Sequence, residues 1–304
     1  MKMGLVSSIL DGWSYEEMID VVSQKGLSCV EAACWPVGEA ERRYAGVTHI
    51  DVDTLDAAKA AHYLQYATDR NVDISALAYY PNTMDPDLEK REKIITHLYK
   101  VIDAAEMLHV NLVTTFIGRD QTKTVEDNLQ LVKKVWPPIL DYAKKKGVRI
   151  AIENCPMLFG VDQWPGGQNL MTTPVLFEKI FDLLPYDNLG LNFDPSHFVW
   201  QMLNYYTPIY FFKDKLFHIH FKDLKVRQRQ LERVGILAYP LEYMSPKLPG
   251  LGDVDWKMVI AALTDVGYDG CACIEIEDKA FEGSREKILD SITLSKRYLD
   301  QFVI

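Results

Sequence analysis

Short apolar runs alternate with longer amphipathic segments along the whole chain of 304 residues. The apolar runs read as strands, and they span residues 2–9, 27–34, 72–79, 110–116, 148–153, 188–194, 216–222 and 271–276. Each run is followed by apolar residues at helical spacing, in segments 14–25, 53–70, 85–105, 124–146, 174–184, 199–211, 254–266 and 284–302. This alternation predicts parallel strands that are joined by right-handed helical crossovers.

Eight strand–helix units fit a closed α/β barrel, so we expect a (β/α)₈ TIM barrel that forms one domain over residues 1–304. A doubly wound nucleotide-binding sheet would carry a glycine fingerprint after its first strand, and residues 7–13 have none. Ser14 and Glu17 predict a capping box at the first helix. Pro137 and Pro138 predict a kink or break in the fourth helix, and residues 223–252 are expected to form a long connection.

A polar residue ends four of the apolar runs in the second half of the chain: Glu153, Asp194, His220 and Glu275. Any one of them alone is more often a helix cap or a histidine that bonds the backbone. Together they would converge at one edge of a parallel barrel, where three carboxylates and an imidazole form a ligand set for a divalent cation. His218 points the same way as His220 and is expected one layer deeper.

The loops after the second, fifth and seventh strands are long, and they lie on the face where barrels carry their chemistry. Trp35 follows the second strand and Trp13 follows the first. Such rings suit the apolar face of a sugar, and they would equally serve to cover the top of the barrel.

Composition narrows the function classes. A formal charge of −10 argues against binding to nucleic acid or to an anionic membrane surface. No apolar run reaches about 18 residues, so we expect no membrane span, and the first residues lack the pattern of a signal peptide. The five cysteines show no zinc-ribbon spacing and fit a reducing cytoplasm.

Several motifs of the chain resemble the xylose isomerase-like TIM barrel superfamily, the sugar phosphate isomerases and epimerases, over nearly the whole length. They are Ile152-Glu153-Asn154, Asn192 to His197, His218 to Asp223, Pro249 to Gly252 and Ile274-Glu275. The resemblance implies one divalent ion that is held by Glu153, Asp194, His220 and Glu275, and a substrate contact from His197. Two features depart from the ketose 3-epimerases. Cys155 to Phe159 stand where those enzymes have a second glutamate, and this chain offers Lys222 and, further out, Arg227 where they have an arginine after the histidine strand.

The expected function is therefore a metal-dependent isomerase or epimerase of a sugar or sugar derivative. The ion, Mn²⁺ in the first place and Mg²⁺, Co²⁺ or Zn²⁺ as alternatives, would stabilise an enediolate while Glu153 and Glu275 remove and return a proton. His197, Lys222, Trp13 and Trp35 would bind the small-molecule sugar.

Three other functions stay open. A lyase of the same fold, either an inosose-type dehydratase or a 3-keto-glycoside eliminase, would use the same enediolate. An abasic-site endonuclease would need more metal-binding histidines and a basic surface, and a non-catalytic sugar-binding protein would show no turnover. The pattern also leaves open whether the chain forms a homo-oligomer.

Overall fold

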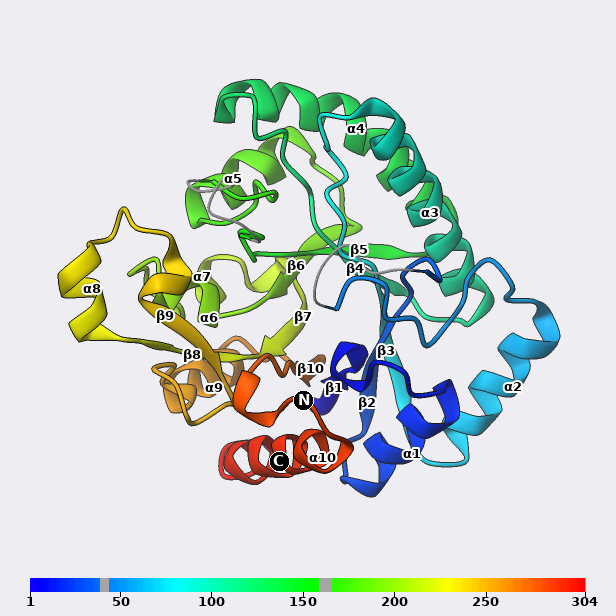
Figure 1. Ribbon diagram of the computed structural model, residues 1–304. Helices are drawn as coiled ribbons and strands as arrows, with labels where there is room; N and C mark the ends of the chain where they lie inside the picture. Colours follow the sequence, from blue (N-terminus) through cyan, green and yellow to red (C-terminus); the bar gives the residue numbers. More distant parts are fainter. Residues whose placement is uncertain (39–43, 159–165, 304) are drawn as a thin grey trace.

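A computed structural model describes residues 1–38, 44–158 and 166–303 of the chain. Eight parallel strands close a barrel in the order β1-β10-β7-β6-β5-β4-β3-β2 (Figure 1). The barrel strands are β1 Lys2–Val6, β2 Cys29–Ala33, β3 Asp73–Ala78, β4 Leu112–Thr115, β5 Arg149–Glu153, β6 Leu189–Phe193, β7 Leu216–Phe221 and β10 Cys271–Ile274. The predicted (β/α)₈ barrel is confirmed.

Helices surround the barrel and connect its strands (Figure 1). The α-helices are α1 Tyr15–Gln24, α2 Ala57–Thr68, α3 Leu88–Met107, α4 Val125–Lys145, α5 Pro174–Leu183, α6 Ser196–Val199, α7 Thr207–Phe211, α8 Gln228–Val234, α9 Trp256–Asp265 and α10 Arg285–Leu299. Short 3₁₀ turns occur at η1 Ser7–Leu10, η3 Lys213–Lys215, η4 Pro240–Glu242 and η5 Lys279–Phe281. The predicted capping box at Ser14 and Glu17 is confirmed, since each residue's side chain accepts from the other's backbone N–H.

Two helix predictions differ in part from the structure. The prolines at 137 and 138 do not break α4, which runs through both of them. Each proline removes one helical donor, and the carbonyls left over belong to Lys133 and Lys134, whose exposed positions give water access to them. The helix predicted over 199–211 is instead two short helices, α6 and α7, which are separated by a turn.

Residues 223–247 form a small unit that projects from the barrel beyond β7, and we call it the cap. Its strands β8 Asp223–Val226 and β9 Met244–Lys247 pair antiparallel, with α8 and η4 between them (Figure 1). Buried Leu224, Leu231 and Tyr243 of the cap pack with Trp200 into a separate apolar cluster. The sequence predicted only a long connection here, because the cap's apolar residues are too few and too scattered to show a clear period.

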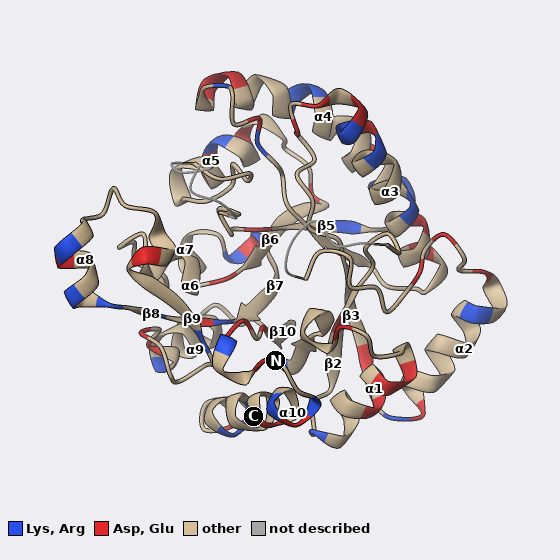
Figure 2. Cartoon of the chain, in the orientation of Figure 1, with Lys and Arg blue, Asp and Glu red and all other residues tan. Residues whose placement is uncertain are grey.

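The main core lies between the outer faces of the strands and the helices. Inside the barrel, small side chains fill the floor: Cys29, Ala76, Ala151 and Cys273 are fully buried there. On the outer helices α3 and α4, lysines and arginines are interspersed with acids (Figure 2). Among the described residues, no helix has the length and apolar character that crossing a bilayer requires.

Candidate metal centre

The four strand-end residues meet at the carboxyl ends of neighbouring strands. Glu153 is the last residue of β5, and Asp194 directly follows β6. His220 is the second-to-last residue of β7, and Glu275 directly follows β10. One ligand atom from each of them lies within 4.8 Å of the ligand atoms of the other three. The Nδ1 atom of His220 lies 3.0 Å from Glu275 Oε2 and 3.6 Å from Glu153 Oε1. Parallel pairing has thus brought together residues that are far apart in the sequence.

Asparagines fix the carboxylates by bonding the backbone around them. Asn154 accepts from the backbone N–H of Asp194 at 2.7 Å and donates to its carbonyl at 2.8 Å. The side chain of Asp194 accepts through Oδ1 from the N–H of Ser196 at 2.8 Å. Asn169 donates to the carbonyls of Glu153 and Cys155. The backbone at both strand ends is therefore held rigidly, and Oδ2 of Asp194 remains directed at the other ligand atoms.

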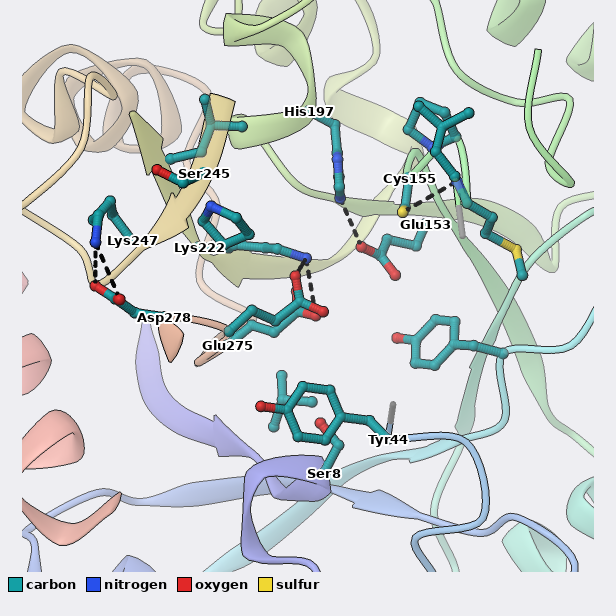
Figure 3. Close-up of a pocket in the computed structure, with 18 of the residues that line it drawn as sticks. Ser8, Tyr44, Glu153, Cys155, His197, Lys222, Ser245, Lys247, Glu275 and Asp278 are labelled. Atoms are coloured by element: carbon teal, nitrogen blue, oxygen red, sulfur yellow. Dashed lines mark hydrogen bonds and ion pairs between the residues drawn. The ribbon is translucent and has the colours of Figure 1, made fainter. Parts of the chain in front are cut away.

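His197 comes from α6 and closes one side of the set. Its Nε2 atom lies 3.2 Å from Asp194 Oδ2 and 3.5 Å from Glu153 Oε1. Lys222 lies on the other side, where its ammonium contacts Glu275 at 3.2 Å and Glu277 at 2.6 Å. Figure 3 shows Glu153, His197, Lys222 and Glu275 pointing toward a common space.

Burial and neighbouring charges shift the pKa values of this cluster in opposite directions. Burial alone would lower the pKa of His220, but the carboxylates of Glu31 and Glu275 hold that pKa well above its ordinary value. Burial raises the pKa of Glu275. Burial acts on Glu153 in the same sense, but contacts with His197 and His220 outweigh it and lower the pKa of Glu153. The cluster thus holds more negative charge than its neighbouring cations balance, and it draws protons onto its histidines.

The donor atoms fit a divalent cation. Five buried atoms in the described part of the chain lack a hydrogen-bond partner and lie in this one cluster: Glu153 Oε1, Asp194 Oδ2, His197 Nε2, His220 Nδ1 and Glu275 Oε2. Buried polar atoms are normally satisfied, so five together at one point indicate a place for a cation. Three carboxylate oxygens and one imidazole nitrogen are donors that Mn²⁺, Mg²⁺, Co²⁺ and Zn²⁺ all accept.

Behind His220 lies an acidic residue that the sequence analysis missed. Glu31 of β2 is fully buried, and its Oε2 lies 2.7 Å from the Nε2 of His220. Tyr80 and Thr114 donate to its other oxygen at 2.5 and 2.9 Å. A glutamate inside an apolar strand was a usable signal, because Cys29 and Glu31 alternate inward in the same way as the predicted ligands. It was overlooked because it precedes the strand's end.

His218 lies deeper in the barrel than His220. Its Nδ1 is 3.0 Å from the side-chain oxygen of Asn192, and its Nε2 is 3.1 Å from the hydroxyl of Ser75. The nearest carboxylate is Glu31, at 3.4 Å. Within the described residues, the cluster of potential ligands that contains His218 is the one with Glu31 and His220, and it does not include Glu153 or Glu275.

A cavity of about 830 Å³ opens above the set. Glu153, His197, Lys222, Glu275 and Trp35, all predicted site residues, line it. Further lining comes from aromatic, apolar and charged side chains, namely Tyr44, Tyr80, Phe116, Cys155, Met157, Trp200, Arg227, Met244, Lys247, Glu277 and Asp278. Asp194 and His220 lie below this lining, as ligands at the bottom of a pocket would.

Trp13 lies apart from this cavity. It lines a second hollow of about 490 Å³, and the guanidinium carbon of Arg285 lies 4.1 Å above its ring. Tyr44 lines both hollows. The structure therefore brings five of the six predicted catalytic and substrate-binding residues to one cavity and leaves Trp13 in the neighbouring hollow.

The cap supplies one wall of the cavity, and Asp223 anchors the cap. The buried Asp223 carboxylate accepts from the backbone N–H groups of Leu224, Gly250 and Val254 and from the indole of Trp256. It thereby ties the two ends of the insertion to α9. A β-carbon at Gly252 would lie 2.0 Å from Asp223 Oδ1, which explains why glycine stands there. Lys247 of the cap contacts Asp278 at 3.1 Å across the rim of the cavity (Figure 3).

Comparison with known proteins identifies the family. The model of the xylose isomerase-like TIM barrel matches residues 19–298. An inosose dehydratase of Lacticaseibacillus casei is 26% identical over 205 residues, which are 66% of this chain and 64% of that enzyme. The match thus spans less than two thirds of the length of that relative.

Solved structures agree on the fold. A crystal structure of the IolI protein with a bound zinc atom has a TM-score of 0.73 at 17% identity and covers 100% of this chain and 99% of its own. A D-psicose 3-epimerase, solved in the presence of D-fructose, has a TM-score of 0.72 at 14% identity and covers 99% of both chains. At such identities the likeness shows the fold alone. Because the family model covers most of its length, the chain belongs to the xylose isomerase-like TIM barrel family.

Proposed function

We propose that the protein is a divalent-metal-dependent isomerase or epimerase of a sugar or sugar derivative. The observation that carries this proposal is the pair of glutamates, Glu153 and Glu275, whose oxygens lie 3.6 and 3.0 Å from His220 Nδ1. Both belong to the same cluster of unpartnered atoms, and both line the cavity. In this proposal Glu153, Asp194, His220 and Glu275 hold the ion, for which we propose Mn²⁺.

A bound divalent ion would supply Lewis-acid polarisation of the substrate's carbonyl, which acidifies the adjacent C–H bond. One of the two glutamates takes that proton as a general base, and the electron pair moves toward the carbonyl oxygen. The other glutamate delivers a proton to carbon. Delivery to the opposite face of the same carbon restores the carbonyl and gives an epimer. Delivery to the former carbonyl carbon gives the isomer, in which the proton of the neighbouring hydroxyl passes to the former carbonyl oxygen. Glu153 and Glu275 come from β5 and β10, so they approach the cavity from different sides.

A lyase is the second candidate, and a specific observation favours it. Lys222 places a buried ammonium 3.2 Å from Glu275, at the edge of the cavity. After proton removal by a glutamate, a donor at this position could protonate a β-hydroxyl or a glycosidic oxygen and release it as water or an alcohol. The likeness to inosose dehydratase supports the same function. The segment from Cys155 to Phe159, where the ketose 3-epimerases have a second glutamate, contains none, which is a departure from those enzymes.

The cavity supports a sugar-like ligand. Trp35 and Tyr44 offer aromatic faces, while His197 and Lys222 offer hydrogen-bond donors. We place the substrate contacts at His197, Lys222 and Trp35 and leave Trp13 outside the site because it faces the second hollow. The five cysteines are free thiols, in keeping with a cytoplasmic location.

Deuterium exchange tests the proposal whatever the product turns out to be. The protein is loaded with Mn²⁺ and incubated in D₂O with separate ketoses, inososes and keto-glycosides, and NMR follows deuterium at carbon. We expect exchange into at least one substrate, accompanied by an epimer or isomer. An unsaturated product would assign the lyase function instead, and no exchange into any member of the panel would contradict both.

A further inference from the structure

We propose that Glu31 is a positioning residue that selects the tautomer of His220 in which Nδ1 is the metal-binding nitrogen. This inference rests on the proposed metal site but on no particular reaction. Glu31 lies in β2, and β1 and β10 separate that strand from β7 around the barrel wall. Its side chain therefore reaches His220 across the barrel interior and not along the sheet.

The two nitrogens of His220 have different surroundings. Nε2 lies 2.7 Å from Glu31 Oε2. Nδ1 faces the ligand set, where Glu275 Oε2 is 3.0 Å away, and it has no hydrogen-bond partner among the described residues. The imidazole is therefore held with one nitrogen against a carboxylate that is not part of the ligand set and the other nitrogen at the position of a metal ligand.

The carboxylate of Glu31 determines which nitrogen of His220 carries the hydrogen. An ionised carboxylate only accepts hydrogen bonds, so the short contact with Glu31 requires a hydrogen on Nε2. A neutral imidazole has one N–H, which leaves the lone pair on Nδ1 free for a metal. The opposite tautomer would set a lone pair against the Glu31 carboxylate and direct an N–H at the ligand set. Bonding of this kind behind a metal-binding histidine orients the ring and raises its basicity.

The surrounding donors keep Glu31 in the role of acceptor. Its Oε1 atom accepts hydrogen bonds from the hydroxyls of Tyr80 and Thr114. The amide nitrogen of Asn192 lies 2.8 Å from the Tyr80 oxygen, and the amide oxygen of Asn192 faces His218 Nδ1 at 3.0 Å. The donors thus run in one direction, from His218 through Asn192 and Tyr80 to Glu31. All of these groups are buried or nearly so. Water therefore does not compete for their hydrogen bonds, and each group keeps its role as donor or acceptor.

Asn192 also explains why Glu31 is needed. Its amide nitrogen lies 2.9 Å from His220 Nε2, so an amide N–H competes for the same nitrogen. Without the carboxylate, this amide would donate to Nε2 and favour the tautomer with the hydrogen on Nδ1. Glu31 is the closer of the two groups, at 2.7 Å, and its charge makes the stronger bond.

The test combines metal affinity with a direct measurement of the tautomer. Metal binding requires a neutral imidazole, so the test is made on the zinc-loaded protein. In zinc-loaded wild type labelled with ¹⁵N-histidine, we expect zinc on Nδ1 of His220 and the hydrogen on Nε2. The Glu31→Gln variant keeps the shape of the side chain and removes its charge. Its affinity for Zn²⁺, measured by calorimetry without substrate, should fall by about 10–100-fold. The Glu31→Asp variant restores the carboxylate and should recover part of that loss.

The control is Asp120→Asn, which also removes a buried carboxylate but outside the lining of the cavity. Its zinc affinity should equal that of the wild type. A Glu31→Gln affinity within about twofold of the wild type, or zinc on Nε2 of His220 in the zinc-loaded wild type, would overturn the inference. The nitrogen of His220 that binds zinc in the wild type can be measured even if Glu31→Gln does not fold. A wild type with this tautomer and a bound ion but no exchange of deuterium would refute the proposed function and leave this inference standing.

Discussion

Glu153 and Glu275 have two duties in the proposed site, because each is both a ligand and a candidate acid or base. Both side chains lie within 3.6 Å of His220 Nδ1, and both line the cavity. Removing either of them could simply empty the site. A change to glutamine separates the two duties, since it keeps a coordinating oxygen and removes basicity.

We predict that the Glu153→Gln and Glu275→Gln variants, when loaded with metal, lose turnover by about 10²–10⁴-fold beyond any loss of metal. The variant that lacks the first base should show no exchange of deuterium into substrate, while the variant that lacks the second group should keep some exchange. Turnover and exchange are measured at matched metal content. Near wild-type rates in both variants would mean that His197 or Lys222 is the base.

The two histidines of β7 provide a second comparison between single residues. His220 presents Nδ1 to the carboxylates, whereas His218 bonds Asn192 and Ser75 below them. Replacement of His220 by glutamine should therefore remove more metal than replacement of His218 by glutamine. Elemental analysis of the two purified variants checks this order, and the reverse order would place the metal one layer deeper than we propose.

Single residues also show where sequence reasoning succeeded and where it failed. The ligand set was predictable because each member ends an apolar run and parallel strands bring such ends together. Glu31 was missed because it lies within its strand, and its partner on β7 is 189 positions away. Trp13 was correctly expected on the face of the barrel that carries the loops after the strands. The direction of its ring depends on packing against Arg285, which no local sequence pattern shows.

Among the structural elements, the η1 turn depends on a buried histidine. His49 lies 3.1 Å from the Ser7 hydroxyl through Nδ1 and 3.1 Å from the Leu10 carbonyl through Nε2. Ser7 in turn accepts from the backbone N–H of Ala33. His49 thus joins the segment after β2 to the turn that follows β1, next to the cavity. Burial lowers its pKa to about 4.

This shift makes the stability of the fold depend on pH. The ordinary pKa is 6.5, so the unfolded chain takes up a proton on His49 at a higher pH than the folded chain does. The contribution of neutral His49 is complete above pH 6.5 and is lost as the pH falls from there to about 4. The loss amounts to about 3 kcal/mol of unfolding free energy. Denaturant unfolding at a series of pH values should show a shallower decline for His49→Gln in this interval, and equal slopes would contradict the assignment.

Prediction of the elements followed the strength of their periodicity. The barrel strands and long helices were found because their apolar positions repeat, and their ends carry capping residues such as Ser14 and Thr124. The cap was missed because short strands with few buried residues carry no such signal. The residues that anchor it, Asp223 and Gly252, belong to motifs that the sequence analysis singled out. Their role in anchoring the cap follows only from their contact in three dimensions.

At the scale of the whole molecule, the closed barrel converts a sequence pattern into a site. Eight parallel strands deliver their carboxyl ends to one rim, and the strands that carry the ligand set are β5, β6, β7 and β10, which are consecutive in the barrel. The floor below is packed with small buried residues, and the cap forms a wall above. The chain could be assigned to its architecture by alternation alone, but the shape of the cavity depends on the cap and on long-range contacts.

The central claim is that one divalent ion sits among Glu153, Asp194, His220 and Glu275, and elemental analysis of purified protein tests it most directly. Asp194→Asn is the variant of choice, since Asp194 lies below the cavity lining and its Oδ2 has no hydrogen-bond partner among the described residues. Asp120→Asn serves as the control. We predict one divalent ion per chain in the wild type and in the control, and the loss of most of the metal in Asp194→Asn. A full complement of metal in Asp194→Asn would contradict the claim.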